Sequence, residues 1–214
     1  PTYSGGVIEN DLRDIRNTPG IVNAVQMNAI PLSGSGSSTG IRLDAGDDAQ
    51  TFGVAYYYVD EQAIDTLGVD LIAGENFTAT DVTWRDPFDP RWPPEVILSR
   101  AVAEALFPDD PLSAIGKTVI VSDSPTTVIG IVDRLQAPWT GWSNVERAML
   151  VPQRVATKSA RYLIRAEPGR RDEMMAHVED MLSKSNPGRL VRRLESMQET
   201  RRQSYSLDVG LAKV

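Results

Sequence analysis

Apolar residues recur at helical and then at strand spacing near the start of the chain. Ile8, Leu12 and Ile15 occupy positions i, i+4 and i+7, which lie on one face of a helix. A Thr-Pro-Gly turn at residues 18–20 ends that helix, and residues 21–29 then alternate in the way of a half-buried strand. The pattern therefore predicts a helix that packs on a core and leads into a strand.

Two β-α-β units of similar size stand far apart in the sequence. The first covers residues 54–74, where β-forming residues precede a short helix after Asp60. The second covers residues 161–195, where a strand precedes a helix that ends near Ser185 and a further strand follows. Two such units pair naturally into one split sheet covered by helices on one face. The residues thus predict an α+β fold.

The residues between these units have a different composition. Loops rich in Pro and aromatic residues, at 83–94 and 137–144, alternate with short strands and one helix at 100–107. Residues 40–147 carry a net charge of −11, whereas residues 148–214 carry +5. Such a change of charge along the chain suggests that the middle faces a different environment. We expect a small, mostly-β insertion.

The composition of the 214 residues excludes several kinds of site. There is no Cys and a single His, His177, so disulfides, iron–sulfur clusters, thiolate zinc sites and multi-histidine metal sites are excluded. We expect His177 to lie on the surface beside a helix stripe. A net charge of −7 argues against nucleic acid as a partner. No apolar run is long enough for a membrane span, and the start at Pro1 suggests a piece of a longer protein.

Acidic residues are the remaining candidates for catalysis or metal binding. Their spacing lacks the alternation and the turn Gly of a calcium loop, and no pair or nucleophile motif stands out. The loop acids concerned are Asp44, Asp47, Asp48, Asp81, Asp86 and Asp89. We interpret them as solvated loop residues and predict no catalytic residue, no metal site and no cofactor.

All four tryptophans lie in the middle of the chain, at Trp84, Trp92, Trp139 and Trp142. Tryptophan often anchors a partner, because its ring supplies a large contact area at a small entropic cost. The alternative is that the rings hold two long Pro-rich loops onto a lobe with few other large residues. We predict these four residues as contacts for a partner or substrate and leave the alternative open.

The last part of the chain begins with a Ser-x-x-Glu capping box at Ser196 and Glu199, which predicts a helix running towards Val214. An arginine cluster surrounds this box, and it can pair with acidic neighbours or with lipid headgroups. Its members are Arg189, Arg192, Arg193, Arg201 and Arg202, offset by Glu195 and Glu199.

Several segments, taken in order, follow one recognisable pattern. Residues 54–77 end in a Gly-Glu-Asn-Phe turn, residues 96–120 read VILSRAVAEALFPDDPLSAIGKTVI, and residues 127–132 read TVIGIV. The opening TPGIVNAVQMNAIPLSG at 18–34 and the return segment YLIRAEPG at 162–169 also fit that pattern. In their order and spacing, over essentially the whole chain, these segments resemble the periplasmic core domain of MacB/FtsX-type ABC transporter permeases.

The resemblance implies two lobes: a discontinuous Porter-like lobe of residues 1–80 and 150–214, and an inserted Sabre-like lobe of residues 81–149. It also implies a place on the periplasmic side of the bacterial inner membrane, between two spans that precede Pro1 and follow Val214. The domain would be no enzyme, since a separate cytoplasmic domain or subunit hydrolyses ATP. Its implied role is to transmit transmembrane-helix movement to a periplasmic substrate or partner, in efflux or lipoprotein handling.

The partners implied by the resemblance are a second permease copy, a cytoplasmic ABC ATPase reached through the transmembrane part, and a periplasmic adaptor or substrate. Two other functions stay open. A free-standing periplasmic carbohydrate- or peptide-binding module would have no flanking membrane spans. A small hydrolase using Asp or Glu of the acidic middle would lose its activity when one carboxylate is replaced.

Overall fold

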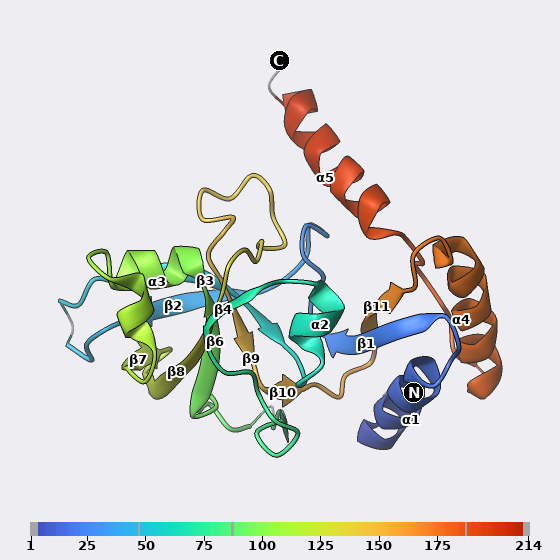
Figure 1. Ribbon diagram of the computed structural model, residues 1–214, viewed down its shortest axis with the longest axis horizontal. Helices are drawn as coiled ribbons and strands as arrows, with labels where there is room; N and C mark the ends of the chain where they lie inside the picture. Colours follow the sequence, from blue (N-terminus) through green and yellow to red (C-terminus); the bar gives the residue numbers. More distant parts are fainter. Residues whose placement is uncertain (1–3, 47, 87, 187, 212–214) are drawn as a thin grey trace.

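The computed structural model describes residues 4–46, 48–86, 88–186 and 188–211 (Figure 1). The helices are α1 (Gly5–Arg16), α2 (Ala63–Leu67), α3 (Arg100–Leu106), α4 (Arg171–Ser185) and α5 (Met197–Leu211), with a 3-10 turn, η1 (Pro111–Ala114). The strands are β1 (Ile21–Met27), β2 (Ser38–Arg42), β3 (Phe52–Tyr58), β4 (Leu71–Gly74), β5 (Thr83–Trp84), β6 (Glu95–Ser99), β7 (Thr118–Val121), β8 (Ser124–Val132), β9 (Ala148–Val151), β10 (Gln153–Arg154) and β11 (Arg161–Ala166).

Most strands of the described residues form a seven-stranded mixed sheet in the order β4-β8-β6-β9-β3-β2-β7. The β3–β9 and β6–β8 pairs are parallel and the other pairs of this sheet are antiparallel. Strand β7 also pairs with the first half of β8, while β4 pairs with its second half. The pairings therefore close into a ring, and that closure leaves few unpaired strand edges.

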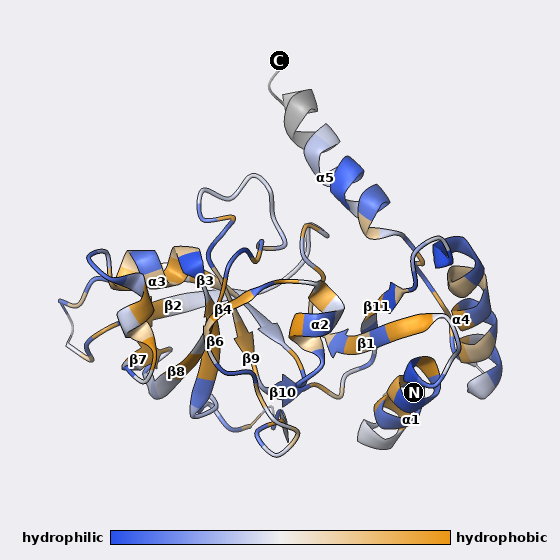
Figure 2. Ribbon diagram, in the orientation of Figure 1, coloured by the Kyte–Doolittle hydropathy of each residue, from blue (hydrophilic) through white to orange (hydrophobic). Residues whose placement is uncertain are grey.

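The large sheet is buried on both faces. In β6, Val96 and Leu98 pack into the core under α3, whereas Ile97 points to the opposite core. Side chains alternate between the faces of a strand, so an uninterrupted apolar run fills both cores. Figure 2 shows this hydrophobic character along β6 and β9.

A second, two-stranded sheet joins β1 to β11 in antiparallel register. Helices α1 and α4 cover one of its faces through an apolar cluster of Ile8, Leu12, Ile15, Ile21, Ala24, Met174, Val178 and Leu182. The other face presents Val25 and Met27 to a core that includes Tyr57 of the large sheet. The predicted apolar face of the first helix is confirmed, because Ile8 and Ile15 are fully buried and Leu12 is 2% exposed.

The mixed α+β class is confirmed, but the expected pairing of the two β-α-β units is wrong. Strands β3 and β4 of the first unit lie in the large sheet, and β11 pairs with β1. Strand β3 is apolar on both faces and therefore fits a sheet that is buried on both sides. Residues 189–195 form no strand, and Leu190 is 75% exposed.

The division into lobes at residues 81 and 149 stays a prediction, and the large sheet joins strands from both sides of these bounds. The predicted last helix is confirmed as α5. Its capping box forms as expected, since Ser196 Oγ accepts from the Glu199 amide at 3.2 Å and Glu199 accepts from the Ser196 amide at 2.9 Å. Within the described ranges, none of the helices combines the length and apolar content that a membrane crossing requires.

Candidate functional site

A buried polar contact joins the first helix to the segment before the last one. Asp11 of α1 accepts a hydrogen bond at 2.9 Å from Arg189 Nη2 and one at 2.7 Å from Tyr162 Oη of β11. The side chains of Asp11 and Arg189 are each 4% exposed, and the two residues are 178 positions apart. Three separate parts of the chain therefore meet at one carboxylate.

The position of Asp11 explains why the contact is buried. It lies three residues after Ile8 and four before Ile15, within the apolar face of α1. A carboxylate on that face needs partners, because an unpaired buried charge is costly. Sequence reasoning missed this site, although an acidic residue inside an apolar helix stripe is a signal that can be read from sequence.

A second buried carboxylate, Asp60, joins α1 to the turn before α2 and to strand β10. Asp60 is 1% exposed and its Oδ2 accepts from Arg16 Nη2 at 2.7 Å and from Arg154 Nη2 at 3.0 Å. Arg16 also donates to the Ala24 carbonyl at 2.9 Å from Nε and 2.6 Å from Nη2. The end of α1, the turn before α2 and strand β10 are thus held together.

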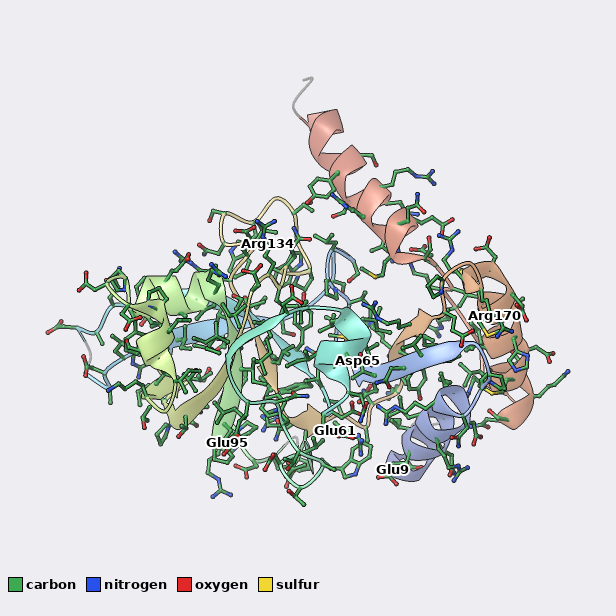
Figure 3. All side chains as sticks on the ribbon, viewed as in Figure 1. Glu9, Glu61, Asp65, Glu95, Arg134 and Arg170 are labelled. Atoms are coloured by element: carbon green, nitrogen blue, oxygen red, sulfur yellow. The ribbon has the colours of Figure 1, made fainter. Side chains whose placement is uncertain are left out.

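Strand β1 contacts α2 through a further polar set. Asn23 Nδ2 donates to Gln62 Oε1 at 2.7 Å and to Asp65 Oδ2 at 2.9 Å, and Figure 3 labels Asp65 on α2. Arg165 of β11 donates from Nε to the Thr66 carbonyl at 3.0 Å. These bonds add direction to an apolar contact, so they fix how α2 sits on the small sheet.

Two hollows adjoin these contacts. One, of about 290 Å³, is lined by Glu9, Leu12, Arg13, Arg16, Asn17 and Arg154. Its arginines already have carboxylate partners, at Asp14 and Asp60, and Glu9 adds a negative charge (Figure 3). The other, of about 390 Å³, is mostly apolar and lies between α2, β11 and the start of α5, with Leu67, Leu135, Leu163 and Met197 among its lining residues.

The structure separates the predicted tryptophans into different surroundings. Trp84 is 38% exposed, and its ring packs so closely on α1 that a Cβ at Gly5 would lie 3.0 Å from Cζ2. Trp92 packs edge-on against Tyr56, with ring centroids 4.9 Å apart, and tilted against Tyr58 at 6.3 Å. These two rings hold the 83–94 loop to α1 and to the large sheet.

Trp139 and Trp142 meet each other at right angles, with centroids 5.7 Å apart, and both pack on the core that contains Tyr57. Their loop lies on a different side of the molecule from the 83–94 loop (Figure 1). The four rings therefore form no single surface. Their role in contact with a partner stays a prediction, and their packing fits the alternative of holding loops in place.

Phe88, which sequence reasoning passed over, is 92% exposed on the same loop as Trp84. The signal was a third aromatic residue, midway between Trp84 and Trp92, in a Pro- and Asp-rich loop. Two contacts join described residues of this loop: Asp86 accepts from the Phe88 amide at 2.9 Å, and Asp89 binds Arg91 at 2.8 Å. The hydrogen bonds from Arg91 lower the pKa of Asp89 to about 2.

The acidic candidates of the sequence serve local structure or face solvent. Asp81 accepts at 2.7 Å from both the amide and the hydroxyl of Thr78, and these bonds lower its pKa. Asp44 and Asp48 are exposed, and Asp47 lies outside the described residues. His177 is exposed on α4, as predicted. In the part of the chain that the structure describes, no three His, Asp or Glu residues are placed to hold a metal ion.

Comparison with known proteins gives a consistent result. The family model of the MacB-like periplasmic core domain matches residues 2–181. The periplasmic region of MacB from Actinobacillus actinomycetemcomitans shares 18% identity and a TM-score of 0.56, over 83% of this chain and 73% of that one. The extracellular domain of the noncanonic ABC-type transporter YknZ from Gram-positive bacteria shares 15% identity and a TM-score of 0.58, over 88% of each chain. No curated protein sequence matched.

Proposed function

The chain belongs to the family of MacB-like periplasmic core domains of ABC transporter permeases, and on this premise we propose that it works without catalysis by transmitting movement. In this proposal, ATP-driven movement of the permease helices reaches the domain through its two ends. The domain carries that movement to a substrate or partner outside the membrane. Efflux and lipoprotein handling are the two processes that the proposal covers.

The observation that supports this function is the buried contact between Asp11 and Arg189. Helix α1 and the segment that leads into α5 would be the two connections to the membrane-spanning part. Because Asp11 of α1 binds both Arg189, from the segment before α5, and Tyr162 of the small sheet, a displacement of either end acts on one core. Close-packed cores move as rigid bodies rather than deform, so a small displacement is carried across the domain.

The second step of the proposed transmission runs from α1 to the short strand pair β5–β10, and β10 directly follows β9 of the large sheet. Arg16 at the end of α1 shares Asp60 with Arg154 of β10, and Trp84 of β5 packs on the first residue of α1. Strands β5 and β10 pair with each other. Helix α1 is thus held near both of its ends by the same strand pair.

The proposed partners are a second permease copy, a cytoplasmic ATPase acting through the transmembrane part, and an adaptor or substrate on the outer side. Trp84, Trp92, Trp139 and Trp142 remain the proposed contact residues, in the inserted lobe of residues 81–149. The exposure of Trp84, together with that of Phe88 on the same loop, favours the 83–94 loop as the first contact to test. The proposal also expects membrane spans encoded before Pro1 and after Val214.

The experiment uses the whole transporter, with its ATPase, in membranes. The chain has no Cys, so a single Cys in place of Leu112, which is 51% exposed on η1, can carry a spin label. Distances between the labels of two copies are measured with and without ATP. We expect an ATP-driven change in the wild type and its loss in Asp11→Asn and Arg189→Gln, while ATP hydrolysis continues.

The matched control replaces an exposed ion pair on α4, through Asp180→Asn and Lys184→Gln, and should leave both readouts unchanged. Folding of each variant is checked by circular dichroism. If the distance between the two spin labels of the wild type is the same with and without ATP, the proposal is contradicted. So would an unchanged ATP response in the Asp11 and Arg189 variants.

A further inference from the structure

Exposed apolar side chains are concentrated just before α5 and on its first turns. We call residues 190–205 the basic strap. Leu190 is 75% exposed, Leu194 and Met197 are each 38% exposed, and Tyr205 is 42% exposed. The other large apolar residues that are exposed in the described part of the chain are scattered over several elements and loops, at Val22, Leu43, Leu112, and Trp84 and Phe88 of the 83–94 loop. Exposed large apolar side chains therefore gather in the strap more than elsewhere on the described surface.

Exposed arginines alternate with these apolar residues. Arg192, Arg193, Arg201 and Arg202 are all exposed, against two acidic residues in the strap. Glu195 accepts from Arg193 at 2.7 Å, and Glu199 accepts from the capping Ser196 while it keeps its charge. Four arginines and two glutamates leave the strap with a net charge of +2, although the chain as a whole carries −7.

The helical part of the strap has two distinct sides. Thr200 and Ser204 are buried, and Ser204 contacts Thr140 of the 137–144 loop at 3.2 Å. Met197, Arg201 and Tyr205 follow at i, i+4 and i+8, so they share a face, and the Arg201 guanidinium lies 5.9 Å from the centre of the Tyr205 ring. This second side, with its apolar and cationic groups, faces solvent.

We propose that the basic strap docks on the surface of a bilayer that contains anionic phospholipid. Arginine side chains bind headgroup phosphates, while Leu, Met and Tyr side chains enter the boundary between headgroups and acyl chains. The proposal rests on the proposed function, which sets the domain beside a membrane. A protein partner fits less well, because protein contacts centre on a compact apolar patch and not on apolar residues separated by charges.

The charge of the rest of the molecule supports one orientation. Residues 40–147 carry −11 and are repelled by an anionic surface, whereas residues 148–214 carry +5 and are attracted to it. In Figure 1 the barrel-like end with β2 and β7 lies at the opposite end of the molecule from α4, while the 137–144 loop contacts α5. Docking through the strap therefore turns the acidic end away from the bilayer and steadies the segment that carries Arg189.

The test measures co-sedimentation of the 214-residue chain with vesicles, in low and high salt. We expect binding to vesicles of phosphatidylglycerol and phosphatidylethanolamine in low salt, and little binding to phosphatidylcholine vesicles or in high salt. Replacing Arg192, Arg201 and Arg202 by Gln should weaken binding about fivefold per residue, or about a hundredfold together. The variant Leu190→Ser with Leu194→Ser should also weaken binding, without any change of charge.

A matched control replaces three exposed basic residues elsewhere, with Arg13→Gln, Lys117→Gln and Lys158→Gln. It changes the net charge by the same amount and should bind like the wild type. The proposal would be overturned by an equal loss of vesicle binding in both triple variants, or by a wild type that shows no preference for anionic vesicles. A wild-type dimer that the strap variants abolish would assign the strap to a protein interface instead. These assays use neither ATP nor the transporter, so their outcome is independent of the label-distance experiment.

Discussion

Replacing Asp60 by Ala tests whether the buried carboxylate holds α1 to the turn before α2 and to strand β10. The substitution removes the shared acceptor of Arg16 and Arg154, and also the Oδ1 that accepts from the Gln62 amide at 3.1 Å. Two guanidinium groups then remain close together without their counter-charge. Neither can move fully into water, because their side chains are only 24% and 20% exposed.

The size of the effect follows from this geometry. Removing one partner of a buried ion pair costs about 3–5 kcal/mol, because the remaining charge is left uncompensated. Partial exposure of both arginines lets water replace some of the lost interaction, so we expect about 3 kcal/mol. For a protein of this length, that corresponds to a fall in Tm of about 6–12 °C.

Urea unfolding followed by circular dichroism measures the change, and the midpoint should fall with little change in the slope m. Asp180→Ala, which removes an exposed ion pair with Lys184, is the control and should leave the midpoint unchanged. Arg16→Ala should cost less in the Asp60→Ala background than in the wild type, because the two residues interact. A loss below about 1 kcal/mol for Asp60→Ala would refute the reasoning, since it is the value of an exposed pair.

Three further results are expected. Burial, and next the neighbouring Tyr56, raises the pKa of Tyr58 from 10.0 to about 12, against the opposing effect of Arg85. The contribution of the neutral Tyr58 to the free energy of unfolding is therefore fully present below pH 10 and is lost as the pH rises towards 12. Tyrosinate absorbance and unfolding at several pH values check this. Gly74→Ala should lower the unfolding midpoint much more than Gly34→Ala: both have φ near +75°, but only at Gly74 would a Cβ strike a backbone carbonyl, that of Ile129. Trp84→Phe should remove the largest share of iodide-quenchable fluorescence, and equal loss on replacing Trp142 would contradict the burial described here.

Local periodicity predicted the elements well. The spacing of Ile8, Leu12 and Ile15 located α1 and its buried face, and the Ser196–Glu199 capping box located the start of α5. Both signals act within a few residues, so the chain around them has little influence. The family followed from the order of several such segments, and the match over residues 2–181 confirms it.

Strand pairing was predicted less well, for a physical reason. An apolar run such as that of β3 shows that both faces of the strand are buried, but it does not show which of several buried strands pairs with it. Its parallel partner β9 lies about 90 residues later and was not identifiable from the local pattern. The expected strand at 189–195 has suitable alternation, but in the structure it pairs with no strand and Leu190 stays in solvent.

The sequence by itself determined the class of fold, the family, the α1 and α5 helices and the absence of Cys and of a histidine cluster, because these depend on composition and short-range spacing. Only the tertiary structure decided that Asp11 meets Arg189 and that Asp60 holds two arginines, since these contacts join residues 44 to 178 positions apart. It also decided which tryptophans are covered and which apolar residues of the strap are exposed. Burial is a property of the whole packed chain, and no residue carries it alone.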